Sequence, residues 1–251
     1  NFREVGAASL FAATHAASGR ELWRSDGSSG GTVLLRDIRA GAASSDPMPL
    51  LVHEGILYFS ADDGVSGREL WKSDGTVAGT LQVADIYPGL DPNSSLPNSS
   101  WPASLVVVAD GSLLFAASDL AGGRELWRTD GTAAGTVRVR DIGPGSEGSS
   151  PSGLVRLGDS VFFSAGDVVP WEPDYDPDRE LWRSDGTEAG TVRVADINPY
   201  GGSDPLWITA SGGFVYFSAD SGGDSPAELW KSDGTSAGTT FVADLEARFL
   251  L

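Results

Sequence analysis

One unit of sequence occurs five times in this chain and limits its possible folds more than any other feature. Each copy contains the pattern E-L-W-[RK]-[ST]-D-G, and each tryptophan stands 14 residues before the aspartate of an Asp-Ile or Asp-Leu pair. These tryptophans recur every 48 to 56 residues, at Trp23, Trp71, Trp127, Trp182 and Trp230. Repeats of this length indicate a solenoid or a propeller, in which each unit buries its apolar faces against its neighbours.

Each copy contains four short segments with the composition of β-strands. In the second copy they cover 50–53, 56–61, 69–73 and 80–86, and the pair Glu54-Gly55 provides a tight turn between the first two. Four antiparallel strands in each of five units predict an all-β fold, a five-bladed β-propeller. A linear solenoid is the alternative, but it would need atypical repeats at its ends, and none is visible.

The ends of the sequence predict how such a ring closes. Asn1 corresponds to Pro49 of the second copy, and the final residue corresponds to Ser44 of the first. We therefore expect a single domain over 1–251, a closed ring with both termini in one inter-blade loop. The expected blades cover approximately 1–44, 45–92, 93–148, 149–203 and 204–251.

The repeated units resemble the bacterial ELWxxDGT-repeat proteins, and the resemblance covers essentially the whole chain. It implies propeller blades in secreted or cell-surface proteins, and it implies no catalytic residues. The first copy departs from the pattern at Ser28, where the other copies have threonine. We expect this change to weaken a local hydrogen bond without changing the fold.

Composition limits which classes of partner and which cellular location are expected for this chain. A formal net charge of −18 argues against a nucleic-acid partner, because phosphate groups are repelled. The chain has no cysteine, so disulfides and thiolate metal sites are excluded, and no apolar run approaches the ~20 residues of a membrane span. The chain opens with Asn and shows no signal peptide. We expect a mature or excised segment of an extracellular or cell-surface protein.

The repeated side chains are expected to build the blades. The five Asp-Gly pairs suit hairpin turns, with cation binding as the alternative, and the tryptophans suit packing between blades, with a stacking platform for ligands as the alternative. We expect the repeated glutamates and the basic residues after each tryptophan to form cross-strand pairs. The aspartates are Asp26, Asp74, Asp130, Asp185 and Asp233, and the glutamates are Glu21, Glu69, Glu125, Glu180 and Glu228.

Two insertions distinguish the copies, one within 87–101 and one within 168–178. In an up-and-down blade both loops would emerge on one face, opposite the Asp-Gly hairpins, and insertions gathered on one face indicate a binding surface. The candidate ligand contacts there are Trp101, Trp171 and Tyr175. The acids Glu172, Asp174, Asp176 and Asp178 form a candidate calcium site, with a solvated acidic loop as the alternative.

One further tryptophan lies outside the repeated E-L-W pattern and outside both insertions. Trp207 aligns with Pro49 at the start of a first strand. We expect its side chain to belong to the core.

No catalytic constellation stands out in the sequence. His15 and His53 lie in different copies, with neither a nucleophile motif nor a metal-binding pair beside them. We therefore expect no enzymatic activity and predict a secreted binding or adhesion module for carbohydrate or for another extracellular protein. A structural subunit of an extracellular assembly is the alternative, and a carboxylate-based glycoside hydrolase is a minor one.

Overall fold

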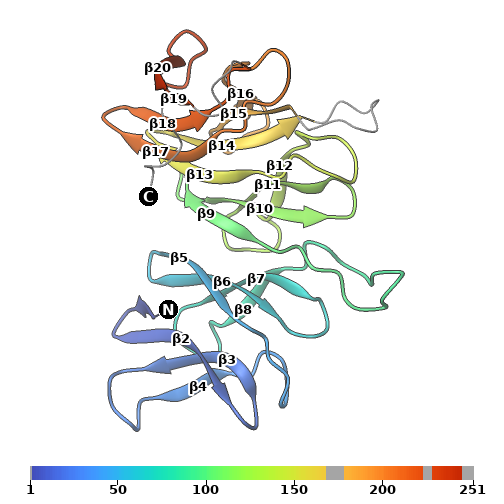
Figure 1. Cartoon of the computed structure of the whole chain (residues 1–251). Coiled ribbons are helices and arrows are strands. Elements are labelled where there is room, and N and C mark those ends of the chain that lie inside the picture. Colours follow the sequence, from blue (N-terminus) through green and yellow to red (C-terminus); the bar gives the residue numbers. More distant parts are fainter. Residues whose placement is uncertain (1, 168–177, 223–227, 245–251) are drawn as a thin grey trace. The chain divides into compact units, whose positions relative to one another are not determined.

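The computed structural model describes residues 2–167, 178–222 and 228–244, and every regular element in these ranges is a β-strand (Figure 1). The strands form five four-stranded antiparallel sheets, and within each sheet the strands are neighbours in chain order. This arrangement confirms the predicted fold class, an all-β chain with five four-stranded blades. No helix long and apolar enough to cross a membrane occurs in these ranges.

The sheets follow the five copies of the repeat. The first sheet contains β1 (Arg3–Val5), β2 (Ala8–His15), β3 (Gly19–Ser25) and β4 (Val33–Arg36). The second contains β5 (Met48–His53), β6 (Ile56–Asp62), β7 (Arg68–Ser73) and β8 (Leu81–Ala84). The third contains β9 (Ala103–Val107), β10 (Leu113–Asp119), β11 (Gly123–Thr129) and β12 (Val137–Arg140). The fourth contains β13 (Ser152–Leu157), β14 (Ser160–Asp167), β15 (Asp178–Ser184) and β16 (Val192–Arg193), and the fifth contains β17 (Leu206–Ser211), β18 (Phe214–Ala219), β19 (Glu228–Ser232) and β20 (Thr240–Asp244).

The predicted strands of the second copy agree with the structure to within two residues at each end. β8 ends at Ala84, although the sequence pattern extends the strand to Ile86. The register of β7 against β8 shifts between Leu70 and Trp71, and the backbone N–H of Ile86 donates to the carboxylate of Glu69. The chain therefore leaves the sheet early because a buried side chain replaces the strand as its hydrogen-bond acceptor.

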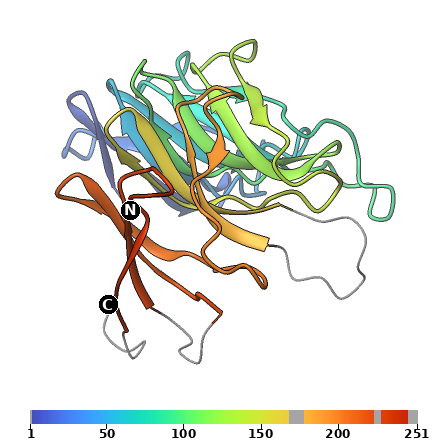
Figure 2. The same ribbon diagram turned by 90° about the horizontal axis from the view of Figure 1, so that it is seen from above.

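The chain divides into two compact units, and the single domain over 1–251 stays a prediction. Unit 1 comprises Asn1–Ala103, Ala117–Asp119 and Gly131–Thr136, and unit 2 comprises Ser104–Ala116, Leu120–Asp130 and Val137–Leu251. Unit 1 includes the first two sheets, and unit 2 includes the last two; both are drawn from a second direction in Figure 2. Closure of a ring stays a prediction.

The core of each unit lies between successive sheets. In unit 1, side chains of the first sheet such as Leu10 and Leu22 pack with Phe59 and Trp71 of the second. In unit 2, Trp182 packs in the same way against the third sheet, and Trp230 packs against the core that the fourth and fifth sheets share. These repeated tryptophans therefore contribute to the cores between sheets.

Candidate functional site

The repeated Asp-Gly hairpins satisfy their own polar groups. The backbone N–H and the hydroxyl of Thr76 donate to Asp74 Oδ1 at 2.9 and 2.7 Å, and the N–H of Gly79 donates to Thr76 Oγ1 at 2.9 Å. The hydrogen bond from the Thr76 hydroxyl is the largest cause that lowers the pKa of Asp74. The aspartate thus acts as a turn residue. Among the described residues no group of three or more histidines and acids could hold a metal ion.

Ser28 does not weaken its hairpin, so that expectation is wrong. Its hydroxyl donates to Asp26 Oδ1 at 2.7 Å and accepts from the N–H of Gly31 at 2.9 Å. Thr76 makes the same two bonds at the same distances. Serine keeps the hydroxyl on which the turn depends and lacks only the methyl group.

The repeated glutamates are not cross-strand pairs, and that prediction is wrong. The side chain of Glu69 is fully buried, and its carboxylate accepts from the Ser100 hydroxyl at 2.5 Å and from the N–H groups of Ser100 and Ile86 at 3.1 Å. The carboxylate therefore fixes both ends of the loop that joins one sheet to the next. The same bond from a serine hydroxyl recurs in three other copies, in the pairs Glu21–Ser45, Glu125–Ser149 and Glu180–Ser203.

Two of these glutamates predict a pH dependence of stability. Burial raises the pKa of Glu69 and of Glu180 to about 7, against an ordinary 4.5, and the hydrogen bonds from the loop serines oppose the shift. Between these pH values the folded chain holds protons that the unfolded chain has released. The free energy of unfolding therefore falls as the pH rises from about 4.5 to 7.

Thermal denaturation across this pH window tests that prediction. We expect a lower Tm at pH 8 than at pH 5, and a smaller difference in Glu69→Gln, which lacks one of the two titrating groups. A Tm that stays constant or rises from pH 5 to pH 8 would contradict the assignment of raised pKa values to these carboxyl groups.

The basic residues after the tryptophans also have another role than predicted. In three copies the cation donates to the backbone carbonyl of the glycine in the next copy's Asp-Gly hairpin. These contacts are Arg24–Gly75 at 3.4 Å, Lys72–Gly131 at 2.8 Å and Arg128–Gly186 at 3.4 Å. The cations thus join consecutive copies, and Arg128 also contacts Asp110 and Ser112 of its own copy.

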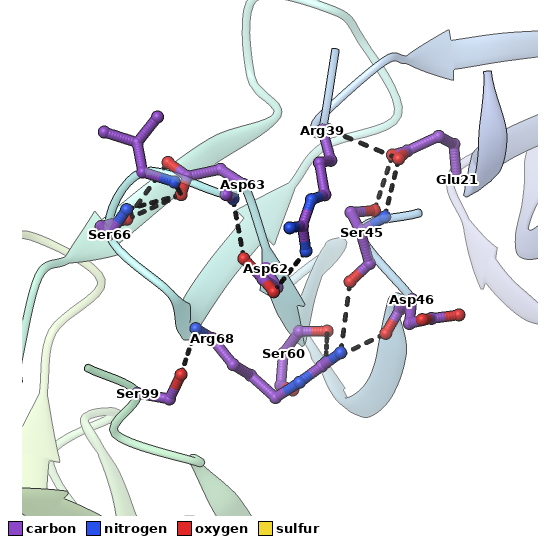
Figure 3. A network of polar contacts seen from close by, with 12 residues as sticks. Glu21, Arg39, Ser45, Asp46, Ser60, Asp62, Asp63, Ser66, Arg68 and Ser99 are labelled. Atoms are coloured by element: carbon purple, nitrogen blue, oxygen red, sulfur yellow. Dashed lines mark hydrogen bonds and ion pairs between the residues drawn. The ribbon is translucent and has the colours of Figure 1, made fainter. Parts of the chain in front are cut away.

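A polar network in unit 1 surrounds Arg68, the first residue of β7 (Figure 3). The guanidinium group donates to Ser60 Oγ at 2.9 Å and to the carbonyl of Asp46 at 3.0 Å, and the side chain is buried. The same group lies over the ring of Trp101, 5.3 Å from its centroid, within the range of a cation–π contact. A buried, hydrogen-bonded arginine therefore contacts an exposed aromatic ring.

Trp101 itself has an unusual backbone. Its φ is 50°, in the left-handed region that bulky residues rarely adopt, and its side chain is 56 % exposed. Trp101 follows Ser100, the serine that is bound to Glu69. In three other copies the residue after the corresponding serine also has a positive φ, but its side chain is small or acidic; these residues are Asp46, Ser150 and Asp204. Both acids form ion pairs with an arginine of the preceding copy, Arg20–Asp46 at 3.6 Å and Arg179–Asp204 at 3.9 Å. Trp101 thus presents a ring where other copies present a polar group.

Trp207 is exposed, so the prediction that it belongs to the core is wrong. Its side chain is 65 % exposed and its φ is 59°. It lies where the register of β17 against β18 shifts between Leu206 and Thr209, and this bulge interrupts the alternation on which the core prediction depended. The corresponding residues of the third and fourth copies are Ser104 and Gly153, which also have positive φ.

The predicted acidic and aromatic loop is mostly outside the described residues. Trp171, Glu172, Asp174, Tyr175 and Asp176 fall in the range 168–177 and lie outside the described residues. Asp178 is described, and its Oδ2 accepts from Arg193 at 2.7 Å. The calcium site and the sharing of one face by the two insertions stay predictions.

Sequence reasoning did not find the pocket in unit 2. A cavity of about 480 Å³ lies between the fourth and fifth sheets, lined by Leu157, Ser160, Phe162, Arg183, Asp233 and Gly234 among others. Its size falls in the range of ordinary small-molecule sites. The sequence feature that accompanies this pocket is Gly158, which stands where the third copy has the acidic residue Asp110.

The comparisons with known proteins support the fold alone. No protein-family model and no curated protein matches the chain. Among solved structures, a puromycin hydrolase is 18 % identical with a TM-score of 0.52, and the match covers 95 % of this chain and 36 % of that one. A puromycin-hydrolyzing peptidase of Mycobacterium tuberculosis is 14 % identical with a TM-score of 0.52, over 99 % of this chain and 38 % of that one. This chain therefore spans somewhat more than a third of these enzymes, and the similarity is to their β-propeller domains.

Proposed function

We propose that this chain is a non-catalytic, extracellular carbohydrate-binding module, and that Trp101 and Trp207 are contacts for its ligand. The repeated units resemble the ELWxxDGT-repeat proteins, and that resemblance supports a secreted or cell-surface location. Aromatic rings stack well on the apolar faces of sugars, and an indole also has an N–H group for a hydrogen bond. The two exposed tryptophans belong to different units, and each is proposed as a contact in its own right.

One observation carries the proposal: in two copies, an exposed tryptophan occupies a strained backbone position where other copies have small or acidic residues. A non-glycine residue in a sparsely populated backbone region costs about 1–3 kcal/mol, and such residues cluster at functional sites. The exposed rings gain little from burial in return. An advantage in ligand binding would explain why tryptophan stands at both positions.

Binding to a printed glycan array, followed by titration of the strongest ligand, tests the proposal. Trp101→Ala and Trp207→Ala should each weaken binding by about tenfold or more, because burying one large apolar side chain contributes about 1.5–3 kcal/mol. The Tm should change little for Trp207→Ala, since that ring is exposed, and Trp101→Ala should lose only the cation–π contact with Arg68, about 0.5–1 kcal/mol. Tyr200→Ala is the matched control, because Tyr200 is 90 % exposed and has no positive φ.

Three results would contradict the proposal. If both tryptophan variants bind every glycan as the parent does, the rings are not ligand contacts. If the parent binds no glycan but forms ordered assemblies that these variants lose, the chain is an assembly subunit. If the array glycans are cleaved, the module is catalytic.

A further inference from the structure

Arg183 differs from the corresponding cations of the first three copies. Arg24, Lys72 and Arg128 each donate to a hairpin carbonyl of the next copy. Arg183 is half-buried in the wall of the unit 2 pocket, and no hydrogen bond or ion pair of this side chain occurs among the described residues. A guanidinium group has five N–H donors and no acceptor, so the N–H groups of Arg183 can donate to a ligand.

Arg128, the corresponding residue of the preceding copy, has a carboxylate as its partner. Its Nη2 forms an ion pair with the carboxylate of Asp110, and its Nε donates to Ser112 Oγ at 2.9 Å. Its stem lies beside the hairpin glycine, with Cδ 3.7 Å from the place that a Cβ on Gly186 would take. The Cδ of Arg183 lies 3.6 Å from the same place on Gly234. The two arginines therefore share a position relative to the next hairpin.

The fourth copy keeps the hydroxyl of this arrangement and lacks the carboxylate. Ser160 corresponds to Ser112, and Gly158 corresponds to Asp110. No atom lies within 4 Å of the place that a Cβ on Gly158 would take, so the volume of the missing side chain is open. Gly158, Ser160 and Arg183 all line the pocket.

We propose that this pocket binds a small ligand through a carboxylate group, which takes the place that the Asp110 carboxylate takes in the third copy. Arg183 would bind the carboxylate, and Ser160 would donate a further hydrogen bond. Leu157 and Phe162 give the pocket an apolar wall for the remainder of the ligand. This site is separate from the proposed sugar contacts at Trp101 and Trp207.

Two protein carboxylates limit the affinity. Asp233 lines the pocket, although its Oδ1 already accepts from the N–H and the hydroxyl of Thr235 at 2.9 and 2.7 Å. Asp185 belongs to the hairpin after β15, where the hydrogen bonds from Thr187 and, to a smaller extent, the charge of Arg183 lower the pKa of its carboxyl group. We therefore expect weak binding that is reduced by salt.

Small ligands with a carboxylate group include acidic sugars, amino acids and peptides with a free C-terminus. Backbone amide shifts of the ¹⁵N-labelled chain, titrated at low salt, distinguish these sources. The two probes are sodium glucuronate, with glucose as its neutral control, and N-acetylalanine, with its amide as the control. At least one acid should shift the amides of Gly213 and Gly234, which line the pocket, and its neutral control should not.

Two variants test the contacts. Arg183→Met keeps the apolar stem beside Gly234 and should weaken binding at least tenfold. Gly158→Asp, combined with Asp159→Gly to keep the net charge, places a carboxylate at the open position and should abolish binding while Arg183 remains. Arg24→Met is the matched control and should bind the acid as the parent does. The proposal fails if neither acid shifts these amides, if the neutral controls shift them equally, or if both pocket variants bind as the parent does.

Discussion

Glu69→Ala is expected to destabilise the chain by at least about 3 kcal/mol, because three buried donors lose their acceptor and each such loss costs about 1–3 kcal/mol. The donors are the N–H of Ile86 and both the N–H and the hydroxyl of Ser100. The carboxylate is fully buried, so water does not readily replace it. The loop from β8 toward β9 would then lose its attachment to β7.

Urea denaturation of Glu69→Ala beside Glu54→Ala measures this effect. Glu54 lies in the exposed turn between β5 and β6 and serves as the control, since its carboxylate has no hydrogen bond among the described residues. Glu69→Gln should cost less than Glu69→Ala, because the amide keeps one acceptor oxygen. Equal midpoints for Glu69→Ala and the parent would show that the buried glutamate does not organise the loop.

Trp71→Ala is expected to cost about 3–5 kcal/mol, the usual cost of a large-to-small change in a core. The Trp71 side chain is 4 % exposed and packs with Leu10 and Leu22 of the preceding sheet. The Arg36 guanidinium group lies 5.6 Å from the centroid of its ring. The substitution therefore leaves a cavity between two sheets of unit 1 and removes the ring that Arg36 faces.

Trp71→Phe separates packing from hydrogen bonding in this prediction. The buried indole N–H of Trp71 has no acceptor among the described residues, so phenylalanine loses no hydrogen bond there. We expect Trp71→Phe to lose clearly less stability than Trp71→Ala in the same urea series. If alanine and phenylalanine prove equally tolerated, the ring does not join the two sheets.

The fold could be predicted because its signals are local and repeated five times. The alternation in 56–61 and the turn at Glu54-Gly55 depend on neighbours in the chain, and the structure has β6 and the turn where the sequence indicates them. The five repeated tryptophans, each 14 residues before an Asp-Ile or Asp-Leu pair, likewise predict one sheet for each copy. These are relations within one copy, which sequence patterns record well.

The roles of individual polar residues could not be predicted, because their partners are far away in the sequence. Glu69 and Ser100 are 31 residues apart, and Lys72 and Gly131 are 59 residues apart. The prediction that Trp207 belongs to the core was wrong for another reason, because a one-residue bulge in β17 turns its side chain out of the core. The pocket at Arg183 has Gly158 where the third copy has Asp110, and the meaning of that difference appears only when the contacts of Arg128 are known.

The most direct test of the proposed function is the ¹H–¹⁵N spectrum of the eight indole N–H groups, recorded during titration with the strongest glycan from the array. We expect the resonances of Trp101 and Trp207 to move with the ligand, whereas those of the buried Trp71 and Trp182 stay in place. Assignment follows from the single tryptophan variants. Shifts confined to the repeated tryptophans, with Trp101 and Trp207 unmoved, would contradict the account.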